Sequence, residues 1–485
     1  SVSMMGCSFI LSLISPLLTD PRGSGRTLQQ CSNTATSTAV GFEEKDDGLS
    51  SYRNAAIALV VGDDTVQGND VSCLPSLIEI VRSGVDSSSW GGRNKARPLK
   101  VQVKAAECIA AVALAVGHVI GMHTDQSAYD PTYVRAKSAL EVMEQERISD
   151  VALQIIKSDS HRSLDSSRDT PDARLREAAG LILLAMSSCS SASSSYLISN
   201  GAVSTSLTIA SEPGMLNAAS TVRGKWASKG LCFLEAATTL LIQAWTTSTE
   251  QESDSGSPAS PSLNLLLEAL NSGAVGLASR LVKTKVTLKS HDLAYSQLRV
   301  KIAICFLLSS MFGIANKSHD NNDVGASRLY SAIDADCAQF LASGGNDTGV
   351  RTDLVGATLN LLNATLPYAH QFTKEDADEP LPMVDLSEAC LLAAGSMCGL
   401  ADPIGVHPTV QSNDDVDEGK YSHLRLDACT MACDVLTATK PGQGALLPSV
   451  LVGAIGESLI VPTLRLSLAI CHYGNIDLCA ELSQS

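Results

Sequence analysis

Residues 172–203 read DARLREAAGLILLAMSSCSSASSSYLISNGAV, and the rest of the chain repeats parts of this pattern. Its first half has the spacing of one buried helical face, with apolar or small residues at Leu175, Ala178, Ala179, Ile182, Met186 and Cys189. Thr170 and Pro171 supply a capping hydroxyl and a proline suited to the first helical position. We therefore predict a helix that begins here and ends near Cys189.

The second half of the stretch predicts a junction between two helices. We interpret the Ser-rich run after Cys189 as a turn, followed by the apolar segment 196–199. Asn200-Gly201 supplies a residue that tolerates positive φ and ends this segment. Ala202-Val203 then opens the next apolar segment.

Both halves recur along the chain. A second Gly-Ala-Val sequence occupies residues 273–275, and 73–81 and 446–452 read as partner helices. Small-residue pairs on apolar helices lie near Ala55, Ala105, Ala178, Ala236, Ala303, Ala389, Ala428 and Ala469. Ala428 and Ala469 are 41 positions apart (469 minus 428), within the roughly 40–47 residues of armadillo and HEAT units. Wider spacings elsewhere are interpreted as loop insertions.

The order of helix, turn, apolar tetrad and Gly-Ala-Val resembles the junction between armadillo repeats. The resemblance implies an all-α, right-handed α-solenoid of armadillo/HEAT-like repeats with long polar loop insertions. It also implies that the Ala-rich helices line a concave groove. Polar positions on these helices are then candidates for the groove surface: Arg53, Lys104, Arg174, Lys301 and Arg425.

Polar, Ser- and Gly-rich segments divide the predicted array. We expect an N-terminal block of repeats over 1–245, with loop insertions at 19–50 and 86–98, and a C-terminal block over 262–485. Residues 246–261 (TTSTEQESDSGSPASP) are predicted to form a disordered linker or loop. Residues 1–18 lack the basic region of a secretory signal and are too interrupted to span a bilayer, so we interpret them as a repeat helix and the chain as a fragment.

Composition narrows the classes of partner. With 35 basic and 51 acidic residues the net charge is −16, which disfavours nucleic acid and anionic membranes and favours basic or mixed-charge proteins or peptides. Aromatic residues make up only 4% of the chain, as suits closely packed helices. The 14 cysteines lie mostly in apolar segments without a regular framework, so we expect a reducing, cytoplasmic location.

No motif in the sequence predicts catalysis, a cofactor or a metal. The acidic run 414–419 lacks the ligand spacing of a calcium loop, and Cys429, Cys433, Cys471 and Cys479 lack the paired spacing of zinc sites. His118 and His123 are five apart, not the four that places two imidazoles on one face. We therefore expect no enzyme and no catalytic, cofactor or metal residues.

Three functional hypotheses follow. The first is a non-catalytic scaffold whose concave groove binds other proteins or peptides. The second is the regulatory helical part of a larger enzyme, chaperone cofactor or trafficking machine whose active domain lies outside this chain. The third is a helical-bundle enzyme with its site between helices.

Overall fold

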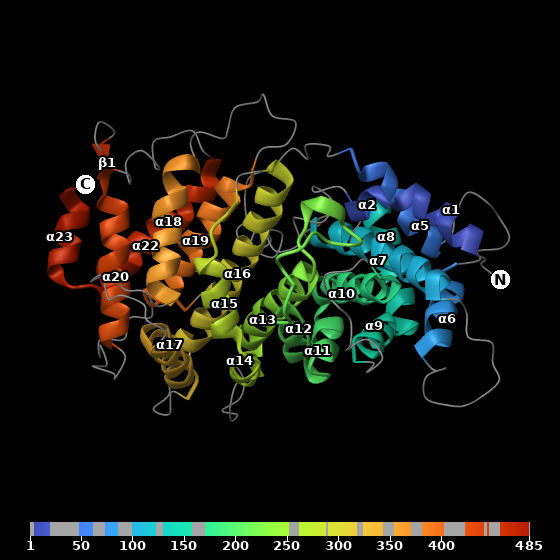
Figure 1. The fold of residues 1–485 in the computed structure, drawn as a ribbon, viewed down its shortest axis with the longest axis horizontal. Helices are drawn as coiled ribbons and strands as arrows, with labels where there is room; N and C mark the ends of the chain where they lie inside the picture. Colours follow the sequence, from blue (N-terminus) through green and yellow to red (C-terminus); the bar gives the residue numbers. More distant parts are fainter. Residues whose placement is uncertain are drawn as a thin grey trace. The chain divides into compact units, whose positions relative to one another are not determined.

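The computed structural model describes residues 4–19, 48–61, 73–85, 99–122, 130–157, 170–251, 261–287, 290–317, 324–342, 354–369, 381–401, 422–440, 444–445 and 456–484. Most of these residues lie in α-helices (Figure 1). The exceptions with regular structure are one short 3-10 helix and a hairpin of two-residue strands, β1 (Thr439–Lys440) and β2 (Gly444–Ala445). The predicted all-α class is confirmed.

The contacts divide the chain into two compact units, Ser1–Gln243 and Ala244–Ser485. The first unit contains α1 (Met4–Ile14), α2 (Pro16–Thr19), α5 (Ser50–Val61), α6 (Leu74–Val85), α7 (Leu99–Met122), α8 (Pro131–Gln145), α9 (Ile148–Lys157), α10 (Pro171–Cys189), α11 (Ser191–Ser199), α12 (Ala202–Ala210), the 3-10 helix η4 (Gly224–Trp226) and most of α13 (Leu231–Gln251).

The second unit contains the end of α13, then α14 (Pro261–Asn271), α15 (Ala274–Lys283), α16 (His291–Lys317), α17 (Val324–Ala342), α18 (Leu354–Ala369), α19 (Met383–Met397), α20 (Ser422–Thr437), the hairpin, α22 (Gly456–Tyr473) and α23 (Ile476–Gln484). Because α13 continues to Gln251, residues 246–251 of the predicted linker are helical. Residues 252–260 of that linker, and nearly all of the predicted loops 19–50 and 86–98, lie outside the described residues.

The helix α10 begins as its sequence predicts. Thr170 is the N-cap, and its side chain accepts a hydrogen bond from the backbone N–H of Ala173 at 3.2 Å. Pro171 fills the first helical position, where its missing N–H would have had no partner within the helix. The local start signal therefore decides this boundary.

The prediction of a Ser-rich turn after Cys189 is wrong, because the serines form α11. Ser190 caps this helix and accepts from the N–H of Ser193 at 3.0 Å. The Glu144 carboxylate of α8 accepts from the hydroxyls of Ser190 (2.7 Å) and Ser193 (2.6 Å). A carboxylate at the positive end of a helix stabilises it, so a tertiary contact overrides the low helix propensity of serine.

One local structure occurs three times. Arg147, Gly201 and Gly273 each have positive φ (53°, 69° and 81°), and each directly precedes a short helix, α9, α12 or α15. Each lies in a two-residue junction after another helix, α8, α11 or α14. The helices α14 and α15 are bent by 66° at their junction. The predicted role of Gly201, and its recurrence at Gly273, is confirmed at the level of the backbone.

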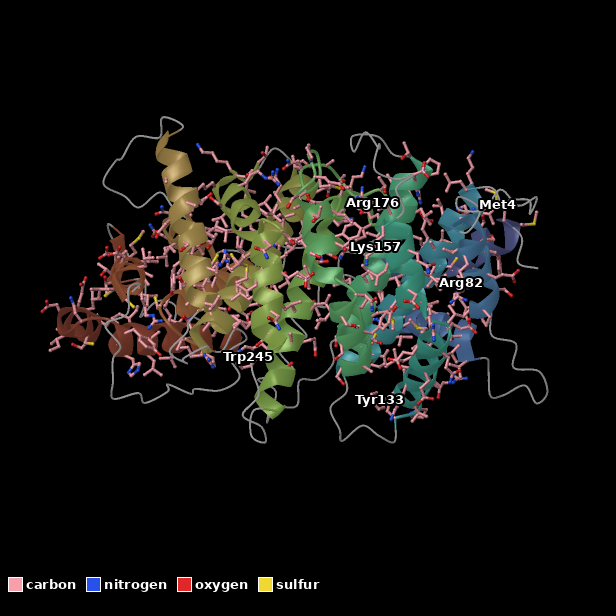
Figure 2. The ribbon with its side chains drawn as sticks, turned by 90° about the horizontal axis from the view of Figure 1, so that it is seen from below. Met4, Arg82, Tyr133, Lys157, Arg176 and Trp245 are labelled. Carbon is pink, nitrogen blue, oxygen red and sulfur yellow. The ribbon has the colours of Figure 1, made fainter. Side chains whose placement is uncertain are left out.

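A second repeated feature is a hydrogen bond from a cationic side chain to a backbone carbonyl, which occurs at two of these junctions. The side chain of Arg82, in the last turn of α6, donates to the carbonyl of Glu146 at 2.5 Å. Lys157, in the last turn of α9, donates to the carbonyl of Asn200 at 2.8 Å. Glu146 and Asn200 are equivalent, since each is the C-cap residue immediately before the residue with positive φ. Both cations are labelled in Figure 2.

A few central helices form the core of each unit. In the first unit α7 packs against α1, α5, α6, α8 and α10, and every residue of α10 from 175 to 187 is buried. In the second unit α19 packs between α16, α18 and α22, and its residues 386–397 are all buried. Small residues allow these close contacts. At Gly180, for example, a Cβ would lie 2.7 Å from Cys232 Sγ and from Phe233 Cζ of α13.

Two described helices are long and apolar enough to cross a bilayer. They span residues 99–121 of α7 and 291–316 of α16. In the structure, 89% and 94% of their most apolar windows are covered by other parts of the protein. A helix that is apolar on all sides is expected at the centre of a helical core as well as in a membrane. The bent pair α14–α15 passes the same test of length and composition.

Candidate functional site

The polar positions predicted to face a groove do not share an orientation. Arg53 and Lys301 are only 5% and 4% exposed, so an outward orientation is wrong for them. The Lys301 ammonium donates to the carbonyls of Leu281 (3.0 Å) and Val282 (2.8 Å) at the end of α15. These carbonyls are at the negative end of a helix, which attracts a cation. Burial lowers the pKa of Lys301 from its usual value.

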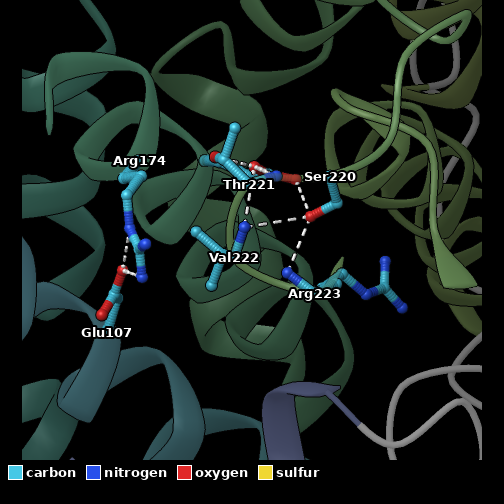
Figure 3. Close-up of polar contacts among 7 residues, drawn as sticks. Glu107, Arg174, Ser220, Thr221, Val222 and Arg223 are labelled. Carbon is cyan, nitrogen blue, oxygen red and sulfur yellow. Dashed lines mark hydrogen bonds and ion pairs between the residues drawn. The ribbon is translucent and has the colours of Figure 1, made fainter. Parts of the chain in front are cut away.

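The other predicted positions are held at separate helix contacts. Arg174 of α10 binds the buried Glu107 carboxylate of α7, with nitrogen–oxygen distances of 2.6 and 2.8 Å (Figure 3). Arg425 of α20 stacks on the ring of Tyr473 of α22, 5.1 Å from its centroid. Lys104 is half-buried on α7. These residues therefore have different environments within their own units.

A dense polar cluster lies elsewhere, beneath the connection from α12 to α13. We call residues 211–230 the clamped loop. Its two arms are paired through their backbones: Leu216 N–H donates to Lys229 O at 2.8 Å, and Ser220 N–H donates to Ala227 O at 2.8 Å. Long loops are uncommon in compact domains and often functional. This loop is therefore the candidate functional site.

Glu177 of α10 anchors the clamped loop. Its buried carboxylate accepts from the hydroxyl of Ser220, the N–H and hydroxyl of Thr221 (2.9 and 2.6 Å), and the N–H of Val222 (3.3 Å). Ser220 Oγ also accepts from the N–H groups of Val222 (3.2 Å) and Arg223 (2.7 Å), so the backbone curls around the Ser220 side chain (Figure 3). A buried carboxylate is tolerated only with such donors.

Two ion pairs hold the same loop, one near its start and one next to its tip. Arg176 of α10 pairs with Glu212, near the start of the loop, through both carboxylate oxygens. Arg223 pairs with Glu235 of α13 at 3.0 Å, and both side chains are 5% exposed or less. A buried pair costs desolvation energy but strongly penalises geometries that separate its members. Together the contacts give the loop one position on α10 and α13.

The tip of the clamped loop carries the groups best suited to a partner. Lys225 is exposed, and its ammonium lies 5.2 Å from the ring centroid of the half-buried Trp226. Both residues belong to η4. Tryptophan is enriched among residues that dominate binding energy at interfaces, and a rigid base lowers the entropy lost on binding.

The cluster offers little room for chemistry on a substrate. A cavity of about 10 Å³ lies between α10, the loop and α13, lined in part by Arg176, Glu177 and Lys229. That volume holds about one water molecule. Burial, followed by the charge of Glu177, raises the pKa of the Cys232 thiol, so this thiol stays protonated and unreactive. Among the described residues, no group of three His, Cys, Asp or Glu side chains could hold a metal ion.

The residues considered for metals are placed as follows. His118, Cys429 and Cys433 are buried in helices, Cys471 is exposed and Cys479 is half-buried. His123 and the acidic run 414–419 lie outside the described residues. The clamped loop could not be predicted from local sequence, because Glu177 and its partners Ser220 and Thr221 are more than 40 positions apart. The hydroxyl pair Ser220-Thr221 ahead of a glycine turn is the one local signal.

Comparison with known proteins identifies no family. No family model matches the chain. No curated protein matches it either. Among solved structures, an engineered protein matches with 11% sequence identity and a TM-score of 0.29, over 95% of this chain and 98% of that one. A similarity at this level carries no argument about fold or function.

Proposed function

We propose that this chain is a non-catalytic protein–protein interaction scaffold built as an armadillo-like, right-handed α-solenoid. The observation that carries the proposal is the repetition of one contact in consecutive repeats. A cation in the last turn of one short helix binds the C-cap carbonyl at the next junction, Arg82 to Glu146 and Lys157 to Asn200. When the same surfaces join successive units by the same contact, the units stack along an axis.

The pattern of helices supports the same arrangement. Short helices joined by a two-residue junction precede a longer, Ala-rich helix in α8–α9–α10, α11–α12–α13 and α14–α15–α16. Within each unit the longer helices contact their successors, as α7 contacts α10 and α16 contacts α19. Nearest-neighbour packing of this kind is the basis of repeat proteins.

The binding surface that we propose is the tip of the clamped loop and not the polar positions of the Ala-rich helices. Lys225 and Trp226 combine a cation with a large ring on a rigid support. The net charge of −16 favours basic or mixed-charge partners, and Lys225 would meet an acidic group of a mixed-charge partner. A cytoplasmic location agrees with the twelve described cysteines, none of which forms a disulfide.

Small-angle scattering tests the architecture. A compact globule of 485 residues has a radius of gyration of about 23 Å, and an extended array has a clearly larger one. A value near the compact limit for the monomeric full chain would rule out the solenoid.

Partner capture with matched variants tests the binding surface. Proteins cross-linked to the full chain in cells are compared for the wild type, Trp226→Ala, Lys225→Glu and Lys137→Ala. Lys137 is an exposed lysine of α8, outside the clamped loop, and serves as the control. We expect the two loop variants to lose the same partner by about tenfold or more, as for truncation of a binding hot spot. Equal capture by all four proteins would exclude the clamped loop as the binding surface.

A further inference from the structure

The turn between α22 and α23 brings two cysteines together at the surface. The Sγ of Cys479, in the first turns of α23, lies 3.4 Å from the carbonyl oxygen of Cys471 in the last turn of α22. Asn475 fixes the turn, because its side chain accepts from the N–H of Leu478 at 2.9 Å.

Accessibility separates this pair from the other thiol pairs of the described chain. Cys305 Sγ and Cys390 Sγ lie 3.7 Å apart between α16 and α19, but both are fully buried. Cys398 and Cys429 are likewise buried. Of the twelve cysteines whose side chains are described, Cys471 is the exposed one, and Cys479 is half-buried. A soluble oxidant therefore reaches this pair and not the buried ones.

We propose that Cys471 and Cys479 are a site of reversible disulfide formation, whose oxidant is a low-molecular-weight disulfide such as oxidised glutathione. The site is independent of the scaffold function proposed above. The bond would link the last turn of α22 to α23 across the Asn475 turn. By holding α23 in place, the bond would also secure its contacts with α20. These include the hydrogen bonds from Thr437 Oγ1 to Glu481 Oε1 at 3.2 Å and from Cys433 Sγ to Leu478 O at 3.9 Å.

The reaction balances as two thiol–disulfide exchanges. The Cys471 thiolate attacks one sulfur of oxidised glutathione, whose S–S bond breaks and releases a glutathione thiolate. The Cys479 thiolate then attacks the Cys471 sulfur, forms the intramolecular bond and releases the second glutathione thiolate. The two cysteine protons pass to the two glutathione thiolates. Two cysteine thiols are thereby oxidised and one glutathione disulfide is reduced.

The environment of Cys471 makes the exchange slow at neutral pH. Partial burial, followed by the charge and hydrogen bonding of Cys479, raises the pKa of Cys471 above its usual value. The thiolate is the reactive form, so only a small fraction of the protein reacts at a given moment. We therefore expect Cys471 to react only under sustained exposure to the oxidant.

The test is peptide mapping of the folded full chain after incubation with oxidised glutathione. Cys31 and Cys337, whose side chains lie outside the description, are first replaced by serine in every sample. We expect a mass loss of two hydrogens and one bridged peptide pair that contains Cys471 and Cys479. We also expect the backbone amides of α23 to exchange about tenfold more slowly in the oxidised protein, because closing a short loop restricts local unfolding.

Variants distinguish the proposed bond from other chemistry. Cys471→Ser and Cys479→Ser should each abolish the mass loss and leave at most one glutathione adduct on the remaining thiol. Cys73→Ser, which removes the other half-buried thiol of the described chain, should change nothing. Four outcomes would each overturn the proposal. They are two separate glutathione adducts on Cys471 and Cys479, a bridge to the nearby Cys433, a bridge between two chains, and no reaction.

Discussion

At the scale of single residues, Glu177 has a large expected effect on stability. Its carboxylate is the acceptor for four donors of the clamped loop. Replacing Glu177 with Ala leaves two backbone N–H groups and two hydroxyls without this acceptor. Each buried donor left unsatisfied costs about 1–3 kcal/mol, and relaxation of the loop recovers part of the sum. We expect Glu177→Ala to destabilise the chain by about 3–5 kcal/mol in urea unfolding.

Hydrogen exchange separates a local effect of this substitution from a global one. The amides of Thr221 and Val222 should lose protection in Glu177→Ala even where the amides of α7 keep theirs. Asp172→Ala is the control, because Asp172 lies on the same helix and contributes none of these contacts to the loop. Unchanged protection at residues 221 and 222 would show that the carboxylate does not hold the loop.

The burial of Lys301 predicts that the free energy of unfolding changes with pH in the alkaline range. Burial lowers its pKa in the folded protein, whereas the unfolded chain has the ordinary value of 10.5. Between these two pKa values the unfolded chain binds a proton that the folded protein does not. The contribution of Lys301 to the free energy of unfolding therefore rises with pH through this window and is constant below it.

The measurement is the difference in free energy of unfolding between the wild type and Lys301→Met as a function of pH. Buried thiols away from Lys301, such as Cys232, have a pKa raised by burial and lose stability as pH rises, but they contribute equally to both proteins and cancel. Cys390 does not cancel, because the Lys301 charge lowers the pKa of this thiol. Losing that charge in Lys301→Met raises the pKa of Cys390 further and so adds to the difference in the same direction. We expect the difference to move in favour of the wild type as pH approaches 10.5. A flat difference would mean that the ammonium is not desolvated.

At the scale of the helices, the contact of α10 with α13 depends on the absence of a side chain at Gly180. An added Cβ there would lie 2.7 Å from Cys232 Sγ and from Phe233 Cζ. We expect Gly180→Ala to destabilise by about 1–3 kcal/mol through overpacking. Gly276, in α15, has no atom within 4 Å of an added Cβ, so Gly276→Ala should stabilise by about 0.5–1 kcal/mol. In thermal unfolding, Gly180→Ala should lower the melting temperature and Gly276→Ala should raise it.

The positive φ shared by the two junctions predicts opposite effects on stability for Arg147→Gly and Gly273→Ala. Arg147 has φ of 53°, a conformation that costs an L residue with a side chain about 1 kcal/mol, so Arg147→Gly should be neutral to stabilising. Gly273 has φ of 81° and open space around it, so Gly273→Ala should cost about 1 kcal/mol from backbone strain alone. If both substitutions changed the free energy of unfolding in urea in the same direction, the two junctions would not share one backbone structure.

These elements show which parts of the fold the sequence predicts. The start of α10 and the turn at Gly201 follow from Thr170, Pro171 and a glycine, because caps and positive φ are local properties. The helix α11 was missed because its serines are stabilised by Glu144, a residue of another helix. The orientation of Lys301 was missed for the same reason, since its acceptors belong to α15.

At the scale of the whole molecule, the apolar composition of α7 and α16 has a testable explanation. Both are covered by neighbouring helices, and we propose that burial in a protein core accounts for their composition. We expect the full chain to purify in buffer without detergent, with the amides of α7 and α16 among the slowest to exchange. The partly exposed helix α8 is the internal comparison. A chain that is recovered only with membranes or detergent would contradict this explanation.

The sequence by itself determined the helical class, the start of α10 and the junction glycines, because periodicity, caps and backbone sterics act within a few residues. Only the tertiary structure decided which charges are buried. Arg53 and Lys301 lie inside, Arg174 binds Glu107, and Glu177 holds the clamped loop, because each of these depends on groups that folding brings from distant positions. Desolvation penalises a buried charge without partners, and the partners are fixed only when the helices pack.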